Sequence, residues 1–281
     1  MPAVEIASAA YGIAAAASWG AGDFCGGVAA KRASAYRVVV GSQVFGAAAL
    51  TALAVASREA VPPIGNLLWC GAAGLAGAIG LLALYRALSA GRMGMAAPVS
   101  GVLSAAVPVL AGAGLDGVPG PWTMIGFAIA LIAVWLVSRT DDAVFAWRAL
   151  GLPIAAGLGF GCFIVVITRA SGGSVYWPLV AARAASVLAL ALTAAIARQP
   201  WWPRRRGLAV VVGAGMFDAA GNALLVLAAH AGRMDVAAVL SSLYPASTVL
   251  LAWIVLHERI NRWQFAGIFV ALTAIVLITV P

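Results

Sequence analysis

The chain carries a few ionisable residues inside long apolar stretches, where a charge costs about 2.5 to 3.5 kcal/mol to insert into a bilayer. Asp218 lies near the middle of one stretch, with Asn222 one turn later on the same helical face. Arg183 lies about two turns into the preceding stretch. An ion pair between Asp218 and Arg183 would lock two helices together. Alternatively, Asp218 faces a central cavity, where it binds a cation or a proton and couples a gradient to transport.

Trp19 and Asp23 form a second candidate group on another stretch. They are one helical turn apart, so indole and carboxylate share a face and could hold a cationic or amphipathic solute by stacking and charge. Asp23 also lies about one turn from the end of its stretch, where it could reach the wet interface or pair with Lys31 or Arg32. Gln43 lies at a comparable depth in the next stretch, which is consistent with a solute pathway or with helix packing.

Hydroxyl groups beside prolines form a third group. A proline inside a membrane helix frees a carbonyl that neighbouring groups or waters must satisfy. The candidates near such breaks are Ser100, Ser241 and Tyr244. We expect them either to line a cavity as donors or to hydrogen-bond back into their own helix.

The composition places most of the chain in lipid. Of its 281 residues, 64% are hydrophobic and 9% are charged, and the mean hydropathy is +1.03. This apolar fraction far exceeds that of an ordinary soluble domain, and about 20 helical residues cross a bilayer. The sequence therefore predicts an all-α polytopic membrane protein with ten transmembrane helices. They are placed near residues 6–27, 37–56, 66–88, 95–114, 122–138, 149–168, 176–197, 208–229, 236–256 and 263–280.

The two halves of the chain resemble one another at an offset of 141 residues. Residues 90–97 align with 231–238, and six of the eight pairs are identical. This indicates two copies of one unit, residues 1–140 and 141–281. Each copy contains an odd number of crossings, so the second must be inverted relative to the first. Inverted repeats are the architecture of many secondary transporters.

The cations are distributed unequally between the loops. The loops after the first, third, fifth, seventh and ninth stretches carry Lys31, Arg32, Arg37, Arg92, Arg139, Arg148, Arg198, Arg204, Arg205, Arg206, Arg259 and Arg262. The other loops carry Arg58, Arg169 and Arg233. By the positive-inside rule the first set is cytoplasmic and both termini are outside.

No folded basic domain displays these charges, so we expect no nucleic-acid partner. Tyr85 and Arg86 are expected to anchor the third stretch at the interface.

Residues 237–246 and 256–267 resemble the signature of the EamA-type transporters of the drug/metabolite transporter superfamily. The signature comprises a Ser-x-x-x-Pro segment and a Glu-Arg pair followed by Trp, Gln and Gly. An aromatic-Gly element, Trp19-Gly20 in one half and Phe160-Gly161 in the other, is also similar to the family pattern. The first half departs from it, with Asp116-Gly117 where the second has His257-Glu258.

The resemblance implies a secondary transporter, in a bacterial inner membrane, that exports amino acids, other metabolites or drugs. It also implies cytoplasmic termini, opposite to the charge count. Protons are the candidate coupling ion. The other expected partners are the lipid bilayer and a small-molecule substrate. The sequence leaves open whether the protein is a monomer or a homodimer. A passive uniporter or channel is one alternative and an intramembrane enzyme another. The sequence has no catalytic constellation, metal-binding cluster or nucleotide-binding loop, so we expect no cofactor.

Overall fold

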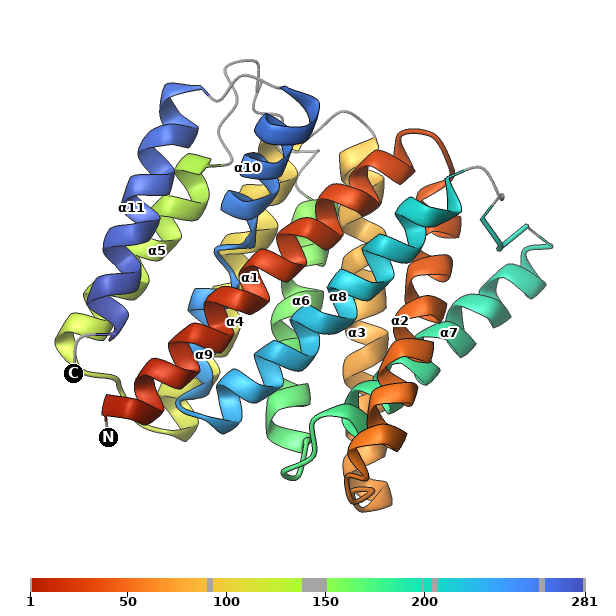
Figure 1. Cartoon of the computed structure of the whole chain (residues 1–281), viewed down its shortest axis with the longest axis horizontal. Coiled ribbons are helices and arrows are strands. Elements are labelled where there is room, and N and C mark those ends of the chain that lie inside the picture. Colours follow the sequence, from red (N-terminus) through yellow and green to blue (C-terminus); the bar gives the residue numbers. More distant parts are fainter. Residues whose placement is uncertain are drawn as a thin grey trace.

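The computed structural model describes residues 2–89, 93–137, 151–198, 200–203, 207–257 and 261–279. These residues form helices and connecting loops, with no strand among them (Figure 1). The helices are α1 (Pro2–Ala30), α2 (Ala35–Ser57), α3 (Ile64–Ser89), α4 (Met93–Leu115), α5 (Pro121–Val137), α6 (Gly151–Ala170), α7 (Tyr176–Ile196), α8 (Leu208–His230), α9 (Met234–Ser241), α10 (Tyr244–Leu256) and α11 (Arg262–Thr279).

The predicted helix over residues 236–256 is in fact broken into α9 and α10. Pro245 lies at the start of α10 and has no N–H to donate to the preceding turn, so the helix is interrupted at Ser242 and Leu243. In the first half Ser104 occupies the equivalent position, and α4 is continuous through it. Counting α9 and α10 as one interrupted helix, the described helices form ten elements that match in pairs at the 141-residue offset.

The first helices of the two halves run in opposite directions. Ser8, near the start of α1, donates a hydrogen bond to the Ala228 carbonyl near the end of α8, at 2.8 Å. Arg233, just after α8, donates to the Gly117 carbonyl at 2.8 Å, and Asp116 beside it pairs with Arg169 at the end of α6. α1 therefore begins where α6 ends. This end, called the terminal end below, also holds both chain termini, so the halves are inverted as predicted (Figure 1).

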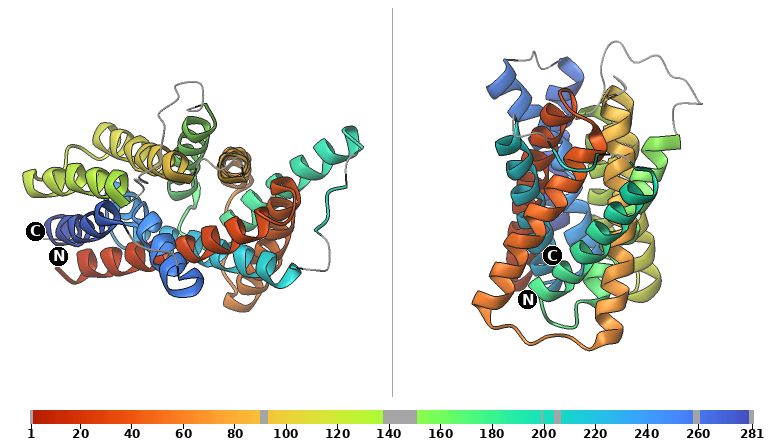
Figure 2. Two further views of the ribbon diagram at one scale, coloured as in Figure 1. Left: turned by 90° about the horizontal axis from the view of Figure 1, so that it is seen from above. Right: turned by 90° about the vertical axis from the view of Figure 1, so that its right-hand side faces the viewer.

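The two halves are interlaced. α1 packs mainly on α8, α3 on α6 and α7, α2 on α7 and α8, and α5 on α11, so most helix neighbours come from opposite halves. Along the bundle, the α5–α11 pair lies at one edge and α7 at the other (Figure 2). The hydrophobic core therefore lies between the halves. The predicted boundary at residues 140 and 141 lies outside the described residues.

Two glycines provide the closest crossings between the halves. A Cβ at Gly74 of α3 would overlap the Ala182 carbonyl of α7. A Cβ at Gly215 of α8 would overlap the Ser42 carbonyl of α2. Gly74 and Gly215 are equivalent at the repeat offset, so the same helix crossing occurs twice. Small residues at such crossings let membrane helices gain van der Waals contact.

The outer surface suits a lipid environment. Residues of α2, α3, α6, α7, α8 and of α9 and α10 together form spans that are long and apolar enough to cross a membrane. Large apolar side chains on this surface are exposed, including Leu68, Ile79, Leu192, Ile254 and Phe269. Lipid tails can cover such side chains, whereas exposing an apolar surface of this size to water would be unfavourable.

The described cations follow the predicted distribution. Lys31, Arg32, Arg37, Arg198 and Arg262 belong to connections or helix starts at the end opposite the termini. Arg37, for example, donates to the Pro200 carbonyl at 3.1 Å across two of these connections. The other cations predicted for this side, Arg92, Arg139, Arg148, Arg204, Arg205, Arg206 and Arg259, lie outside the described residues.

Tyr85 does not anchor the interface, so that prediction is wrong. Its side chain is 2% exposed and packs over Gly26, where a Cβ would overlap the Tyr85 hydroxyl. Gly26 therefore provides a notch in α1 that receives a ring from α3. Burying the ring in this notch is favourable because an aromatic side chain removes a large apolar area from its surroundings.

The start of α7 is fixed by a carboxylate from another loop. The backbone N–H groups of Val175 and Tyr176 donate to Glu59 at 3.0 and 2.9 Å. A carboxylate at a helix N-terminus satisfies N–H groups that have no intrahelical partner and interacts favourably with the helix dipole. This cap positions the helix that carries Arg183.

Candidate functional site

A cavity lies at mid-depth between the two halves. The space inside it that is accessible to water-sized molecules is about 70 Å³, and the cavity is open on one side. Much of the wall is apolar, and the polar and aromatic groups converge on it from α1, α2, α4, α7, α8 and α10. These groups are Trp19, Asp23, Gln43, Ser104, Arg183, Ser186, Asp218, Asn222 and Tyr244. An apolar cavity with a few placed polar groups is typical of a small-molecule site.

Arg183 links three helices at this cavity. Its Nη2 donates to Asp218 Oδ2 on α8, and its Nη1 donates to Gln43 Oε1 on α2. Arg183 is buried, and a buried charge is tolerated when it is paired and hydrogen-bonded. The interhelical ion pair considered from the sequence is therefore present. Because Asp218 also lines the cavity, the pair lies where a solute or a proton could compete with it.

Asp23 faces the same cavity without a partner. It makes no hydrogen bond or ion pair with the described residues, and neither Lys31 nor Arg32 reaches it. The charged groups that line the cavity are then Asp23, Asp218 and Arg183. When both carboxylates are ionised, the site carries one negative charge more than its guanidinium balances. In a poorly solvated site this excess favours a proton or another cation.

Trp19, Asn222 and Tyr244 form a second cluster. The Trp19 Nε1 donates to Asn222 Oδ1 at 3.1 Å, and the Tyr244 ring meets the indole edge to face, with centroids 6.3 Å apart. The Tyr244 hydroxyl is buried beside Ser100 and has no well-aligned hydrogen-bond partner among the described residues. The cluster thus joins α1, α8 and α10 beside the cavity.

Two of the residues proposed from the sequence do not line the cavity. Ser241 donates back to the Ala238 carbonyl of its own helix at 3.0 Å, which is the other outcome considered for it. Ser100 is fully buried behind Tyr244. Trp19, Asp23, Gln43, Arg183, Asp218, Asn222 and Tyr244 all face the cavity.

The sequence reasoning missed the apolar wall of the cavity. Phe160, Phe163 and Ile164 of α6 lie opposite the polar groups, with Gly77 and Leu81 of α3 beside them. A search for intramembrane charges cannot find apolar residues in an apolar chain. The available signal was the repeat itself, because Phe160 is the equivalent of Trp19 at the 141-residue offset.

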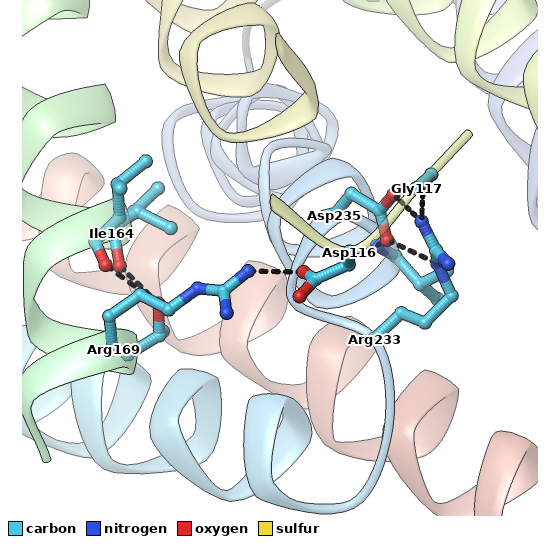
Figure 3. A network of polar contacts seen from close by, with 9 residues as sticks. Asp116, Gly117, Ile164, Arg169, Arg233 and Asp235 are labelled. Carbon is cyan, nitrogen blue, oxygen red and sulfur yellow. Dashed lines mark hydrogen bonds and ion pairs between the residues drawn. The ribbon is translucent and has the colours of Figure 1, made fainter. Parts of the chain in front are cut away.

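A separate polar network lies at the terminal end (Figure 3). Arg169 of α6 pairs with Asp116, and Arg233 makes a two-pronged contact with Asp235 at 3.1 and 2.8 Å while donating to the Gly117 carbonyl. The hydrogen bond from Arg169 lowers the pKa of Asp116, and the bond to Asp235 raises the pKa of Arg233. The network fastens α4 and α6 to the loop between α8 and α9.

Asp116→Asn tests this network through its pH dependence. A carboxyl with a lowered folded-state pKa stabilises the fold above its unfolded-state pKa, and the effect is lost as pH falls through the folded-state pKa. Both side chains are partly exposed, so we expect a loss of a few tenths of a kcal/mol at neutral pH. Thermal unfolding in detergent should show a slightly lower unfolding temperature near pH 7, and this difference should shrink as pH falls below about 4, the ordinary pKa of an aspartate. If the unfolding temperature of Asp116→Asn were lower by the same amount at neutral and at acidic pH, the charge of Asp116 would not be what stabilises the fold.

Comparison with protein families gives matches over nearly the whole chain. The model of the EamA-like transporter family matches residues 7–139 and again residues 147–280. The chain belongs to the EamA-like transporter family. This EamA protein is thus a multi-pass membrane transporter and not an enzyme, and its two family domains indicate duplicated halves.

Comparison with solved structures shows that the fold is shared with another protein. A protein of known crystal structure has a TM-score of 0.78 to this EamA protein at 17% identity, over 96% of this chain and 95% of the other. At that identity the likeness concerns the fold alone. No curated protein matches the sequence significantly.

Proposed function

We propose that this EamA protein is a secondary active transporter that exports a small organic solute in exchange for protons, with the central cavity as the shared site. The observation that carries the proposal is the charge of that cavity. Two carboxylates, Asp23 and Asp218, face it, and one of them lacks a partner among the described residues. Intramembrane carboxylates of this kind bind the coupling proton in many proton-coupled transporters.

Competition for the same carboxylates produces the exchange. A cationic solute is favoured when Asp23 and Asp218 are both ionised, and protonation of either one removes the excess charge that attracts it. When Asp218 binds a proton, Arg183 loses its ionic partner and keeps the Gln43 amide. Solute and proton then occupy the cavity alternately, which is the condition for antiport.

The aromatic groups define the class of solute. Trp19 and Tyr244 offer ring faces and polar edges beside the carboxylates, and a cation over such a ring is stabilised by about 0.5 to 2 kcal/mol. The cavity therefore fits a small amphipathic solute with one cationic group. Amino acids, amine metabolites and cationic drugs share this chemistry.

The fold supplies the movement that exchange requires. Inverted halves can rock about a site at the membrane midplane and open it to each side in turn. One chain contains both halves and every residue of the cavity, so a monomer suffices. The excess of cations at the end opposite the termini favours a cytoplasmic position for that end in a bacterial inner membrane.

Proteoliposomes with an imposed pH gradient test the proposal. Amino acids, polyamines and lipophilic cations are screened for uptake, with protein-free liposomes as the control. We expect at least one solute to accumulate above its external concentration and to leak out when a protonophore removes the gradient. Flux that reaches only equal concentrations would support a passive uniporter instead. No flux of any solute, at any pH gradient, would contradict the proposal.

A further inference from the structure

The repeat offset pairs residues across the cavity. Trp19 is equivalent to Phe160, Asp23 to Ile164, Asp218 to Gly77 and Asn222 to Leu81. All eight of these residues line the cavity. An inverted repeat would give a cavity with the same groups on both sides if its halves had kept the same sequence. Here each pair has one member with a polar group and one without.

The polar and apolar members are segregated by helix. Trp19 and Asp23 belong to α1, and Asp218 and Asn222 to α8, which packs along α1 (Figure 1). The apolar members belong to α3 and α6, which pack along each other in the same way. The cavity thus has a polar wall on α1 and α8 and an apolar wall, namely Gly77, Leu81, Phe160 and Ile164, on α3 and α6.

We infer that the apolar wall determines specificity: it binds the uncharged end of the solute, so that the transporter selects solutes charged at one end only. This inference rests on the function proposed above and deepens it. The polar wall offers carboxylates to one cationic group, whereas a second charge at the far end of the solute would lie against Leu81 and Ile164, neither of which can pair with it. Burying a charge without a partner is strongly unfavourable, and burying an apolar group is favourable.

Leu81 is the position at which the inference is best tested. Leu81→Asn gives α3 the residue that its equivalent position has on α8, and both side chains have four heavy atoms in a similar branched arrangement. Leu81→Met is the matched control, because it keeps the wall apolar at nearly constant volume. Phe160→Tyr is a second test variant, since it adds a hydroxyl to the same wall at a half-buried residue.

The probes are n-butylammonium, charged at one end, and 1,4-diaminobutane, charged at both. Their affinities for the purified full chain are measured by calorimetry in detergent, without any gradient. We expect the unaltered protein and Leu81→Met to prefer butylammonium by about tenfold or more. In Leu81→Asn the ratio should fall about threefold or more, and in Phe160→Tyr it should fall in the same direction.

The outcomes separate this inference from the proposed function. If both amines bind and the ratio is the same in folded Leu81→Asn and Phe160→Tyr, the assignment of the apolar wall is wrong while the cationic site stands. If Leu81→Asn does not fold, Phe160→Tyr alone decides. If neither amine binds to the unaltered protein, the cationic site proposed above fails, and the inference fails with it.

Discussion

Removal of the Asp218 carboxylate together with its partner charge should give a transporter that folds but no longer uses a proton gradient. In Asp218→Asn alone, Arg183 keeps a buried positive charge that only neutral amide oxygens, at Gln43 and at the new Asn, accept from among the groups it contacts here. Breaking one side of a buried pair costs about 3 to 5 kcal/mol, so this single variant should be less stable. The double variant Asp218→Asn, Arg183→Gln removes both charges and should unfold close to the temperature of the unaltered protein.

The double variant distinguishes the two interpretations of the ion pair. If the pair only locks α7 to α8, restoring stability should restore transport driven by a pH gradient. If Asp218 takes part in coupling, accumulation should fall to the level of protein-free liposomes although the protein inserts and unfolds cooperatively. We expect the second result. Full accumulation by the double variant would remove Asp218 from the mechanism.

Alanine at either of the two glycine crossings should clearly lower the stability of the protein. In Gly74→Ala and Gly215→Ala the new methyl group overlaps a backbone carbonyl of the neighbouring helix, which cannot move without displacing that helix. Overpacking of this kind costs about 1 to 3 kcal/mol or more. Thermal unfolding in detergent should show a clear decrease for both variants, of similar size because the crossings are equivalent.

Gly71→Ala is the control for these crossings. It lies one turn from Gly74 on α3, and its new Cβ would lie 3.5 Å from the Ala185 Cβ, an ordinary contact. We expect little loss in this variant, or a small gain, because alanine favours helix more than glycine does. Equal unfolding temperatures for Gly71→Ala and Gly74→Ala would show that α3 and α7 are not held together at this crossing.

The features predictable from the sequence were those with a long-range signal. Ten apolar stretches and a gapless 141-residue repeat determine the number of helices and the inversion. Asp218 and Arg183 stood out because charges are rare in apolar segments. These signals need no knowledge of packing, since they depend on composition and period alone.

The features that the sequence did not predict depend on packing partners. Tyrosine is a residue type that is common at membrane interfaces, but Tyr85 is buried in the notch that Gly26 leaves on another helix. The break between α9 and α10 depends on Pro245 at a position where α4 has Ser104. The apolar wall consists of residues that any membrane helix contains, and only its position opposite α1 and α8 makes it part of a site.

Proton release on solute binding tests the central claim most directly. A cationic solute identified in the transport screen is added to the detergent-purified protein in weak buffer, and the pH change is followed with an indicator dye. If solute and proton compete for Asp23 and Asp218, binding should release up to about one proton per solute, and the affinity should rise with pH. Binding of the solute with no proton released, and with an affinity independent of pH, would contradict the account.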